Sequence, residues 1–515
     1  MRKFFDIVLI QRNKNLSLED IGKILGGEKV EIDTESINYV LESFTFLQEF
    51  SKNKTIYGIN TGLGPMAQYK VDEGRQVELQ YNLIRSHSAG SGRPIDEHFV
   101  KAAMVSRLRS IIQGISGIHP STVTLLAELI NHDIIPVIPE HGGVGASGDL
   151  VQLSHLALIL VGEGEVIYQG KVRPTADVFR ENNLEPITVV LREGLSLING
   201  TSVMTGIGLV NIIQAKKLLH WSILATALLS EIVESFSDYF SEELNRVKTH
   251  SGQQFVAGEL RKILLDSKLI SSRESEFYNH INERVFKKKV QEFYSLRCLP
   301  QVLGPVYDTL LCAENVVVEE LNSVSDNPIV CHECENVFHG GNFHGDYVSL
   351  EMDKLKLVIT RLSMVAERQI NFLFNKNLNN KLPPFVNLGV LGLNLGMQGA
   401  QFTATSTTAE NQTLATSVYI HSIPTNNDNQ DIVSMGTNSA LMAAKVIDNA
   451  FQVLSVELIG LLQAVDYLKI EEKLSTVTKN TYNTLRQLVP VFVDDTPKYE
   501  EIRKIYQHIL NNQAY

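Results

Sequence analysis

The longest apolar repeats in this chain have helical spacing, and they constrain the fold more than any other feature. Between residues 355 and 370, apolar side chains follow one another at steps of four, three, four and four, which places them on one face of a helix. Similar spacing runs through residues 203–236, 309–321 and 439–468. Helices of this length normally lie side by side. The sequence therefore predicts a mainly α protein with a central bundle of long helices.

The first part of the chain has a different character. Up to about residue 190, shorter segments alternate with Gly-rich turns at residues 57–64, 88–94 and 141–149. No repeat, low-complexity tract or Pro-rich linker separates domains. We therefore expect three consecutive regions, namely a loop-rich N-terminal region at 1–195, the long-helix bundle at 196–470 and a short helical C-terminal region at 471–515.

Charge and composition favour a small-molecule ligand. The 515-residue chain has 46 Lys and Arg against 58 Asp and Glu, so its net charge is −12. Nucleic acid and anionic membranes both attract an excess of cationic side chains, so neither is an expected partner. The longest uncharged stretches, 195–215 and 385–409, hold too many amide and hydroxyl groups to cross a bilayer. The N-terminus has no export-signal pattern, so we expect a soluble, cytoplasmic protein.

The four cysteines are too few for a disulfide framework. Cys331 and Cys334 resemble half of a zinc site, but no second Cys pair completes it. We therefore expect a surface turn at these residues and no metal centre.

The segment HGGVGASGDL at residues 141–150 is the first candidate for chemistry. Its four glycines leave the backbone free to adopt positive φ angles and to approach itself closely. One interpretation is an anion-binding nest at the start of a helix near Asp149. The other is a backbone cyclisation, in which the amide nitrogen of Gly148 bonds to the carbonyl carbon of Ala146. Loss of water from the ring and from the Ser147 side chain would then leave a methylidene group.

Eight motifs, in order along the chain, resemble those of the aromatic amino-acid ammonia-lyases. This family comprises the histidine, phenylalanine and tyrosine ammonia-lyases, which are built on the 4-methylideneimidazole-5-one (MIO) group. Ala-Ser-Gly followed by Asp-Leu, at residues 146–150, matches the signature of the family. The resemblance implies a homotetramer whose long helices pack together and whose pockets draw residues from more than one subunit. The other matching segments are YGINTGLG at 57–64, INGT at 198–201, VQEFYSLRCLPQVLG at 290–304, SDNP at 325–328, GGNFHGD at 340–346, AENQT at 409–413 and NQDIVSMG at 429–436.

The resemblance also implies a role for each matching residue. The ring made from Ala146-Ser147-Gly148 would be the electrophile, so neither a metal nor an external cofactor is expected. Tyr57 would remove the β-proton of the substrate, and Arg297 would hold the substrate carboxylate with two hydrogen bonds. Asn199 and Tyr294 match positions that hydrogen-bond the ring and the substrate. The remaining matching pocket residues are Gly64, Ser86, His87, Gln291, Asn327, Phe343, Glu410 and Gln430.

The motifs point in two directions on the identity of the substrate. Ser86-His87 and Glu410 look like the histidine ammonia-lyases, whereas Asn429-Gln430-Asp431 is similar to the tyrosine and phenylalanine branch. A histidine can hydrogen-bond a phenol, so we expect a tyrosine ammonia-lyase that converts L-tyrosine to trans-4-coumarate and ammonia. The alternatives are a histidine ammonia-lyase, which makes urocanate, and an MIO-dependent 2,3-aminomutase. A catalytically silent helical scaffold would require Ser147 to remain an ordinary serine.

Overall fold

The computed structural model describes residues 7–278, 284–286 and 288–515 of the chain. These residues are mostly helical, which confirms the predicted fold class. They form two compact units, each built from separate stretches of sequence. The units interleave along the chain, and the three consecutive regions expected from the sequence stay a prediction. Unit 1 comprises Met1–Ile213, Ala313–Asp353 and Ser417–Ala443, and unit 2 comprises Gln214–Cys312, Lys354–Thr416 and Ala444–Tyr515.

Unit 1 holds the N-terminal helices and the short strands. β1 and β2 pair in parallel, whereas β3–β5, β4–β6, β6–β7 and β8–β9 are antiparallel pairs. The helices are α1 (Leu18–Leu25), α2 (Thr34–Phe50), α3 (Gln76–His87), α4 (Glu97–Ile111), α5 (Pro120–Asn131), α6 (Leu150–Leu160), α7 (Thr175–Asn182) and α8 (Glu193–Ile198). The strands are β1 (Ile7–Ile10), β2 (Lys29–Ile32), β3 (Ser91–Pro94), β4 (Ile135–Pro136), β5 (Pro139–His141), β6 (Glu165–Tyr168), β7 (Lys171–Pro174), β8 (Ile329–Cys331) and β9 (Asn336–Phe338).

The four predicted apolar repeats lie on four long helices, although the repeat at 203–236 continues four residues past the end of its helix at Ile232. These are α9 (Ser202–Ile232), α13 (Leu299–Leu321), α14 (Asp346–Phe374) and α17 (Gly436–Leu468). The stripe that begins at Leu355 and ends at Ile370 is buried along α14, with no member more than 3% exposed. Burial of one continuous apolar face holds such a helix in place far more firmly than helix propensity does.

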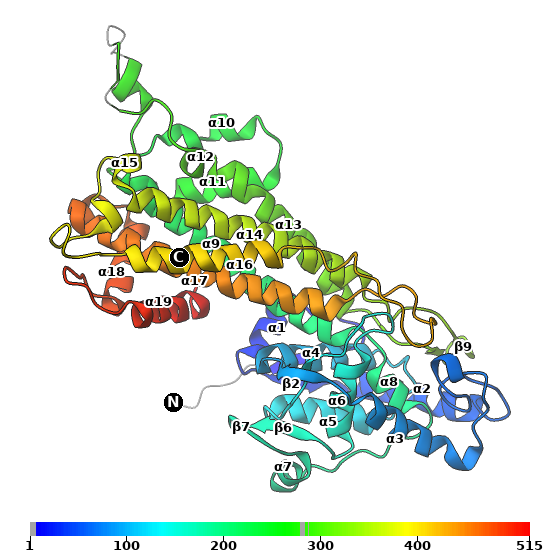
Figure 1. Cartoon of the computed structure of the whole chain (residues 1–515). Coiled ribbons are helices and arrows are strands. Elements are labelled where there is room, and N and C mark those ends of the chain that lie inside the picture. Colours follow the sequence, from blue (N-terminus) through cyan, green and yellow to red (C-terminus); the bar gives the residue numbers. More distant parts are fainter. Residues whose placement is uncertain (1–6, 279–283, 287) are drawn as a thin grey trace. The chain divides into compact units, whose positions relative to one another are not determined.

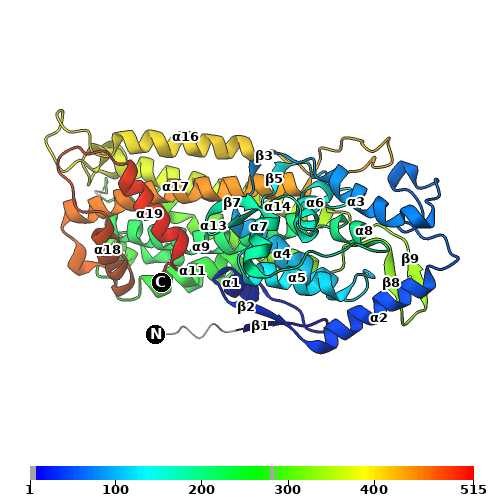
Figure 2. The same cartoon turned by 90° about the horizontal axis from the view of Figure 1, so that it is seen from below.

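In unit 2, α16 (Gln398–Leu414) lies beside the parts of α14 and α17 that belong to this unit (Figures 1 and 2). Thr360 of α14 donates a hydrogen bond to the Asn411 carbonyl oxygen at 3.2 Å, and the Asn411 side chain donates to the Val446 carbonyl oxygen of α17 at 3.1 Å. Polar side chains thus join the three helices within an apolar bundle. The other helices of the unit are α10 (Glu242–Arg246), α11 (Ser251–Ile263), α12 (Tyr294–Arg297), α15 (Lys376–Asn379), α18 (Thr476–Leu488) and α19 (Tyr499–Asn511).

Helix α17 is long and apolar enough to span a membrane by length and composition alone. However, 78% of its most apolar window is buried inside the fold. A helix that is apolar all round and buried is typical of a protein core.

The turn between β8 and β9 is closed by a disulfide bond between Cys331 and Cys334. The sequence analysis expected a turn at these residues but did not predict the bond. The hairpin packs on unit 1 through Val330 and Val337, which form a buried apolar cluster with Ile56 and Ile59. This cluster anchors both ends of the segment around Tyr57.

Candidate active site

The Ala146-Ser147-Gly148 segment forms a tight turn that leads into α6. Gly145 and Gly148 have φ angles of 78° and 71°, which residues with a Cβ rarely adopt. A Cβ added to Gly148 would lie 2.0 Å from the carbonyl oxygen of Gly200. Position 148 therefore requires glycine for two reasons, namely the backbone angle and the close approach of a second segment.

That second segment, residues 199–201 after α8, is called the strap here. The Gly200 carbonyl oxygen accepts a hydrogen bond from Asp149 N at 2.7 Å, and Asn199 Nδ2 donates to the Ser147 carbonyl oxygen at 3.1 Å. The strap therefore holds the main chain on both sides of Gly148. The other side-chain atom, Asn199 Oδ1, is buried and has no hydrogen-bond partner among the described residues.

Gln430 approaches the triplet from a different loop. Its side-chain amide donates a hydrogen bond to the Ser147 hydroxyl at 2.9 Å. The loop is closed by backbone hydrogen bonds in both directions between Thr425 and Gln430. Two of the sequence-predicted residues, Asn199 and Gln430, thus contact Ser147 directly.

Asp149 joins the triplet turn to the start of α9. Its carboxylate is fully buried and accepts hydrogen bonds from the backbone N–H groups of Val203 and Met204, both at 2.9 Å, and from the Thr437 hydroxyl. A carboxylate at a helix N-terminus is stabilised by the helix dipole. Nevertheless, burial raises the pKa of Asp149 to about 6, because desolvation outweighs these hydrogen bonds.

Tyr57 lies in the Gly-rich loop at residues 57–64, as the sequence predicted. Its hydroxyl accepts a hydrogen bond from Gly64 N at 3.1 Å. Gln80 of α3 donates to the Gly58 carbonyl oxygen at 2.9 Å and fixes the start of the loop. A Cβ on Gly58 would lie 2.5 Å from a methyl carbon of Leu195, so this turn also depends on glycine.

A cavity of about 800 Å³ within unit 1 brings most of the predicted residues together. Helix α3 forms one wall, the Tyr57 loop and the Gln430 loop form others, and Ser147 lies at its surface. The predicted residues that line it are Tyr57, Gly64, Ser86, His87, Ser147, Asn199, Asn327, Phe343 and Gln430.

His87, at the end of α3, is oriented by its own helix. Its Nδ1 atom lies 3.0 Å from the Leu83 carbonyl oxygen and 3.1 Å from the Ser86 hydroxyl. A carbonyl oxygen only accepts hydrogen bonds, so the first contact requires a proton on Nδ1. In the neutral ring, Nε2 is then an acceptor that can receive a hydrogen bond from a ligand.

Three predicted residues lie elsewhere, around a cavity of about 570 Å³ within unit 2. These are Gln291, Tyr294 and Arg297. The Arg297 guanidinium lies 4.7 Å from the centre of the Tyr294 ring. Its Nε atom is buried and has no hydrogen-bond partner among the described residues. Such an unsatisfied cationic donor is suited to an anion that is not part of this unit.

Glu410 also belongs to unit 2, on α16. Its carboxylate accepts a hydrogen bond from Asn449 at 2.7 Å and lies 4.0 Å from the Lys445 ammonium. Glu410 lines neither of the two cavities described above. The structure of one chain therefore distributes the predicted site over residues of both units.

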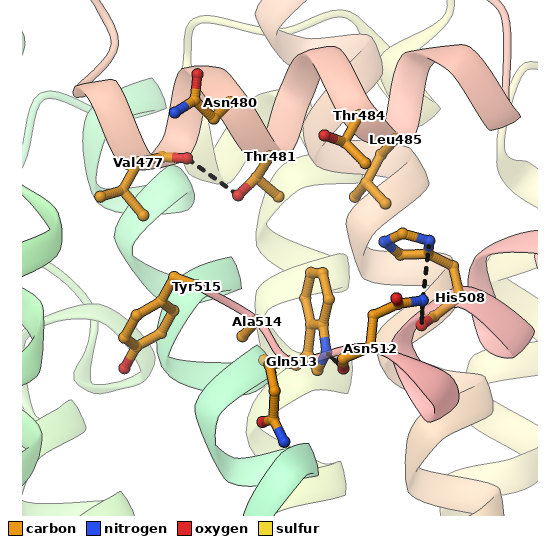
Figure 3. Close-up of a pocket in the computed structure, with 11 residues that line it drawn as sticks. Val477, Asn480, Thr481, Thr484, Leu485, His508, Asn512, Gln513, Ala514 and Tyr515 are labelled. Atoms are coloured by element: carbon orange, nitrogen blue, oxygen red, sulfur yellow. Dashed lines mark hydrogen bonds between the residues drawn. The ribbon is translucent and has the colours of Figure 1, made fainter. Parts of the chain in front are cut away.

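A third cavity, of about 460 Å³, is formed by α18, α19 and the C-terminal residues (Figure 3). Thr481 donates to the Val477 carbonyl oxygen at 3.0 Å, and the Asn512 side chain donates to the His508 carbonyl oxygen at 2.9 Å. None of the residues predicted from the sequence lines this cavity. We therefore do not include it in the candidate active site.

The sequence analysis missed several residues of the 800 Å³ cavity. Leu79, Asn82 and Leu83 precede Ser86 on the same face of α3 at steps of three, one and three. Helical spacing back from Ser86 would have predicted these three cavity residues from the sequence. Asn426 and Asn429 come from the turn before Gln430, and a run of amides in a turn carries no such signal.

Comparisons with known proteins agree on the fold and on the class of enzyme. A tyrosine 2,3-aminomutase from Chondromyces crocatus is 41% identical over 94% of this chain and 93% of that protein. A histidine ammonia-lyase from Shouchella clausii is 37% identical over 98% of each chain. The crystal structure of a tyrosine aminomutase from Streptomyces globisporus matches with a TM-score of 0.94 at 36% identity, over 98% of this chain and 97% of that one.

These names correct one prediction. The sequence motifs led us to expect a tyrosine ammonia-lyase in preference to an aminomutase, and that preference is wrong. Four relatives that are 37–41% identical are tyrosine 2,3-aminomutases, and the matching crystal structure is a tyrosine aminomutase as well. The motifs failed here because this chain is 37–41% identical both to tyrosine 2,3-aminomutases and, at 37%, to a histidine ammonia-lyase, so the residues that carry the resemblance do not distinguish the two reactions.

The level that the motifs did establish is the family. Residues 16–487 match the family model for aromatic amino acid lyases. One relative, an MIO-dependent tyrosine 2,3-aminomutase from Streptomyces globisporus, is 39% identical over 92% of this chain and 90% of that protein. The match spans nearly all of the described residues, so this chain belongs to the aromatic amino acid lyase family.

Proposed function

We propose that this protein is an MIO-dependent tyrosine 2,3-aminomutase. It would move the amino group of L-tyrosine from the α-carbon to the β-carbon and give 3-amino-3-(4-hydroxyphenyl)propanoate, or β-tyrosine. The observation that carries the proposal is the 41% identity, over 94% of the chain, to a tyrosine 2,3-aminomutase. The reaction is an isomerisation, so it needs no oxidant, reductant or second substrate.

The surroundings of the triplet suit an MIO ring made from Ala146-Ser147-Gly148. The positive φ angle of Gly148 and the strap hydrogen bonds hold three small residues in a tight turn. When formed, the ring supplies an electrophilic carbon where Ser147 Cβ now lies. Asn199 and Gln430 would hydrogen-bond this group, as they do the serine.

Tyr57 is proposed as the base that takes the β-proton. It shares the 800 Å³ cavity with Ser147, so a bound amino acid can reach both groups. A phenol with an ordinary pKa near 10 is a weak base at neutral pH. The N–H of Gly64 donates a hydrogen bond to the Tyr57 hydroxyl at 3.1 Å and so fixes the position of the hydroxyl in the cavity.

His87 is proposed to recognise the phenol of the substrate. Because Nδ1 is bonded to the Leu83 carbonyl oxygen, Nε2 can accept the hydrogen bond of a phenol O–H. Phe343 lines the same cavity and offers an apolar surface for an aromatic ring. These features support tyrosine as the substrate in preference to phenylalanine.

A homotetramer with composite active sites is proposed to complete the pocket. The carboxylate clamp Arg297, together with Tyr294, Gln291 and Glu410, does not line the cavity that contains Ser147. The buried Nε of Arg297 has no hydrogen-bond partner among the described residues, which supports an anionic partner from another copy of the chain. A second copy of the chain would supply this group to the substrate carboxylate.

The test is to incubate the purified tetramer separately with L-tyrosine and with L-histidine, and to separate the products by chromatography with mass detection. The proposal predicts β-tyrosine as the main product from tyrosine. Coumarate as the final product would instead indicate a lyase, and urocanate from histidine would indicate a histidine ammonia-lyase. The Ser147→Ala variant, which cannot form the methylidene group, is the matched control and should give none of these products.

A further inference from the structure

Arg107, on α4, is a fully buried cation with an unusual set of contacts. Its side chain is 0% exposed, and Nη1 donates to the Asn199 carbonyl oxygen at 3.1 Å. Its Nε and Nη2 atoms are also buried and have no hydrogen-bond partner among the described residues. Burial lowers the pKa of Arg107 to about 10, so the side chain remains charged at neutral pH.

The buried charges nearby do not form an ion pair with Arg107. Asp326 is bonded through both carboxylate oxygens to Arg192, at 2.9 and 3.1 Å. The Asp149 carboxylate instead accepts hydrogen bonds from the backbone at the start of α9 and from the Thr437 hydroxyl. A buried guanidinium without a paired carboxylate costs folding free energy. Arginine at position 107 is therefore not explained by the stability of the folded protein. The contact of Arg107 with the strap suggests a different role.

The strap is held from behind by three side chains of unit 1. Arg107 bonds the Asn199 carbonyl oxygen, Ser325 Oγ accepts from Thr201 N at 3.1 Å, and Glu320 accepts from the Thr201 hydroxyl. The fit is close, because a Cβ on Gly200 would lie 2.6 Å from Arg107 Nη1. On its front face the same strap bonds the chain on both sides of Gly148. Arg107 therefore limits how far the strap can move away from the triplet.

We propose that Arg107 is a positioning residue for formation of the ring. By blocking the rear of the strap, it presses Asn199 and Gly200 against the triplet and keeps Gly148 N directed at the Ala146 carbonyl carbon. The inference rests on the proposed function, since it requires that the ring form from these residues. It assigns to α4 a role in maturation that does not involve contact with the substrate.

The chemistry that Arg107 assists is a double dehydration. A bond forms between Gly148 N and the Ala146 carbonyl carbon. The Ala146 oxygen leaves as water with the hydrogens of the Gly148 and Ser147 amide nitrogens. The Ser147 hydroxyl then leaves as a second water with the Ser147 Cα hydrogen. Neither an oxidant nor a reductant is needed, so the geometry of the turn controls the rate.

Arg109 provides a matched control on the same helix. It is 2% exposed, and burial also lowers its pKa to about 10. However, Arg109 bonds Asn322 at 2.9 Å and the Arg12 carbonyl oxygen at 3.4 Å, and neither residue belongs to the strap. Replacing Arg109 removes a cation that is nearly as inaccessible to solvent, without releasing the strap.

The experiment compares Arg107→Met, Arg107→Lys and Arg109→Met with the wild type. Each protein is made by cell-free synthesis, sampled over time, and digested, and the peptide that contains residues 146–148 is weighed by mass spectrometry. Loss of two waters reports the ring without any need for activity. Urea unfolding of each protein measures the accompanying loss of stability.

We expect dehydration to slow by at least about tenfold in Arg107→Met, since loss of one charge-assisted hydrogen bond exceeds the ~1.4 kcal/mol that a tenfold rate change requires. Arg107→Lys should be intermediate, and Arg109→Met should mature at the wild-type rate even if it is equally destabilised. Ser325→Ala removes one hydrogen bond to the strap and is a smaller change, so it should also slow dehydration. This variant tests the inference even if neither Arg107 variant folds.

Equal rates in Arg107→Met and the wild type would overturn the inference, as would equal slowing in Arg107→Met and Arg109→Met. A wild-type rate in Ser325→Ala with no folded Arg107 variant would also overturn it. Failure of the proposed function looks different: if no ring forms, the wild-type peptide itself retains both waters, and if the protein is a lyase, the products from tyrosine change while the order of the dehydration rates does not.

Discussion

The hydroxyl of Tyr57 accepts a hydrogen bond from the backbone N–H of Gly64 at 3.1 Å. Both residues belong to one Gly-rich loop, and both line the cavity that contains Ser147. The loop therefore holds the proposed base and a hydrogen-bond donor to its hydroxyl in one segment.

The Tyr57→Phe variant tests this assignment. Removing the hydroxyl should lower kcat by at least about 100-fold, because a general base contributes roughly 10²- to 10⁴-fold. The mass of the triplet peptide should still show loss of two waters. Tyr69→Phe is the control, since Tyr69 lines the same cavity but is not the proposed base. A normal kcat in Tyr57→Phe would remove Tyr57 as the base.

Two glycines with nearly equal φ angles allow backbone strain to be separated from crowding. Gly148 and Gly170 have φ angles of 71° and 72°. A Cβ at Gly170 meets nothing within 4 Å, whereas a Cβ at Gly148 meets the Gly200 carbonyl oxygen at 2.0 Å. Gly170→Ala should cost only about 1–2 kcal/mol of unfolding free energy and keep full activity. Gly148→Ala should displace the strap and yield no ring by mass spectrometry. Ring formation in Gly148→Ala would show that the strap contact is not required.

His87→Phe tests recognition of the phenol. The change removes the acceptor Nε2, so kcat/KM for tyrosine should fall by about 10- to 100-fold while kcat/KM for phenylalanine is maintained or rises. Ser86→Ala leaves the bond between His87 Nδ1 and the Leu83 carbonyl oxygen intact and should change the ratio little. If the ratio of kcat/KM for tyrosine to kcat/KM for phenylalanine were unchanged in His87→Phe, another group would have to hydrogen-bond the substrate hydroxyl.

Glu193, at the start of α8, predicts a pH dependence of stability. Burial raises the pKa of Glu193 to about 7. The hydrogen bonds that Glu193 accepts from His119 N and Val190 N lower its pKa, but by less than burial raises it. Its folded-state pKa is thus higher than its unfolded value of about 4.5. Ionisation is then harder in the folded protein, and the carboxyl reduces stability progressively as the pH rises from about 4.5 to 7.

The measurement for Glu193 is urea unfolding of the wild type and Glu193→Gln between pH 4.5 and 7.5. The glutamine does not ionise, so the free energy of unfolding of the wild type, measured relative to that of Glu193→Gln, should fall by about 3 kcal/mol across this range. Parallel stability curves for the two proteins would show that Glu193 ionises as easily in the folded as in the unfolded state.

The sequence predicted the fold where a local pattern determines it. The stripe from Leu355 to Ile370 is buried on α14 because helical spacing alone decides which side chains share a face. The bond between Cys331 and Cys334 was not predicted, because it depends on the tight β8–β9 turn that brings the two sulfurs together. The division into two interleaved units depends on contacts between distant stretches, which periodicity does not report.

The candidate site was predictable to the extent that motifs carry it. Nine predicted residues line one cavity, whereas Arg297 and its neighbours line another. A motif names residues but does not state which cavity each of them lines. Arg107 was missed for a different reason, because its importance arises from burial and from the strap it contacts. The outcome of the reaction was predicted wrongly, since motifs name catalytic residues but do not report where the amino group ends up.

Retention of the substrate nitrogen is therefore the most direct test of the account. The purified enzyme is given L-tyrosine labelled with ¹⁵N in the presence of excess unlabelled ammonium, and the products are analysed by mass spectrometry. The account predicts β-tyrosine that retains the ¹⁵N label, with little free coumarate. Coumarate together with ¹⁵N-labelled ammonium, and no β-tyrosine, would contradict it.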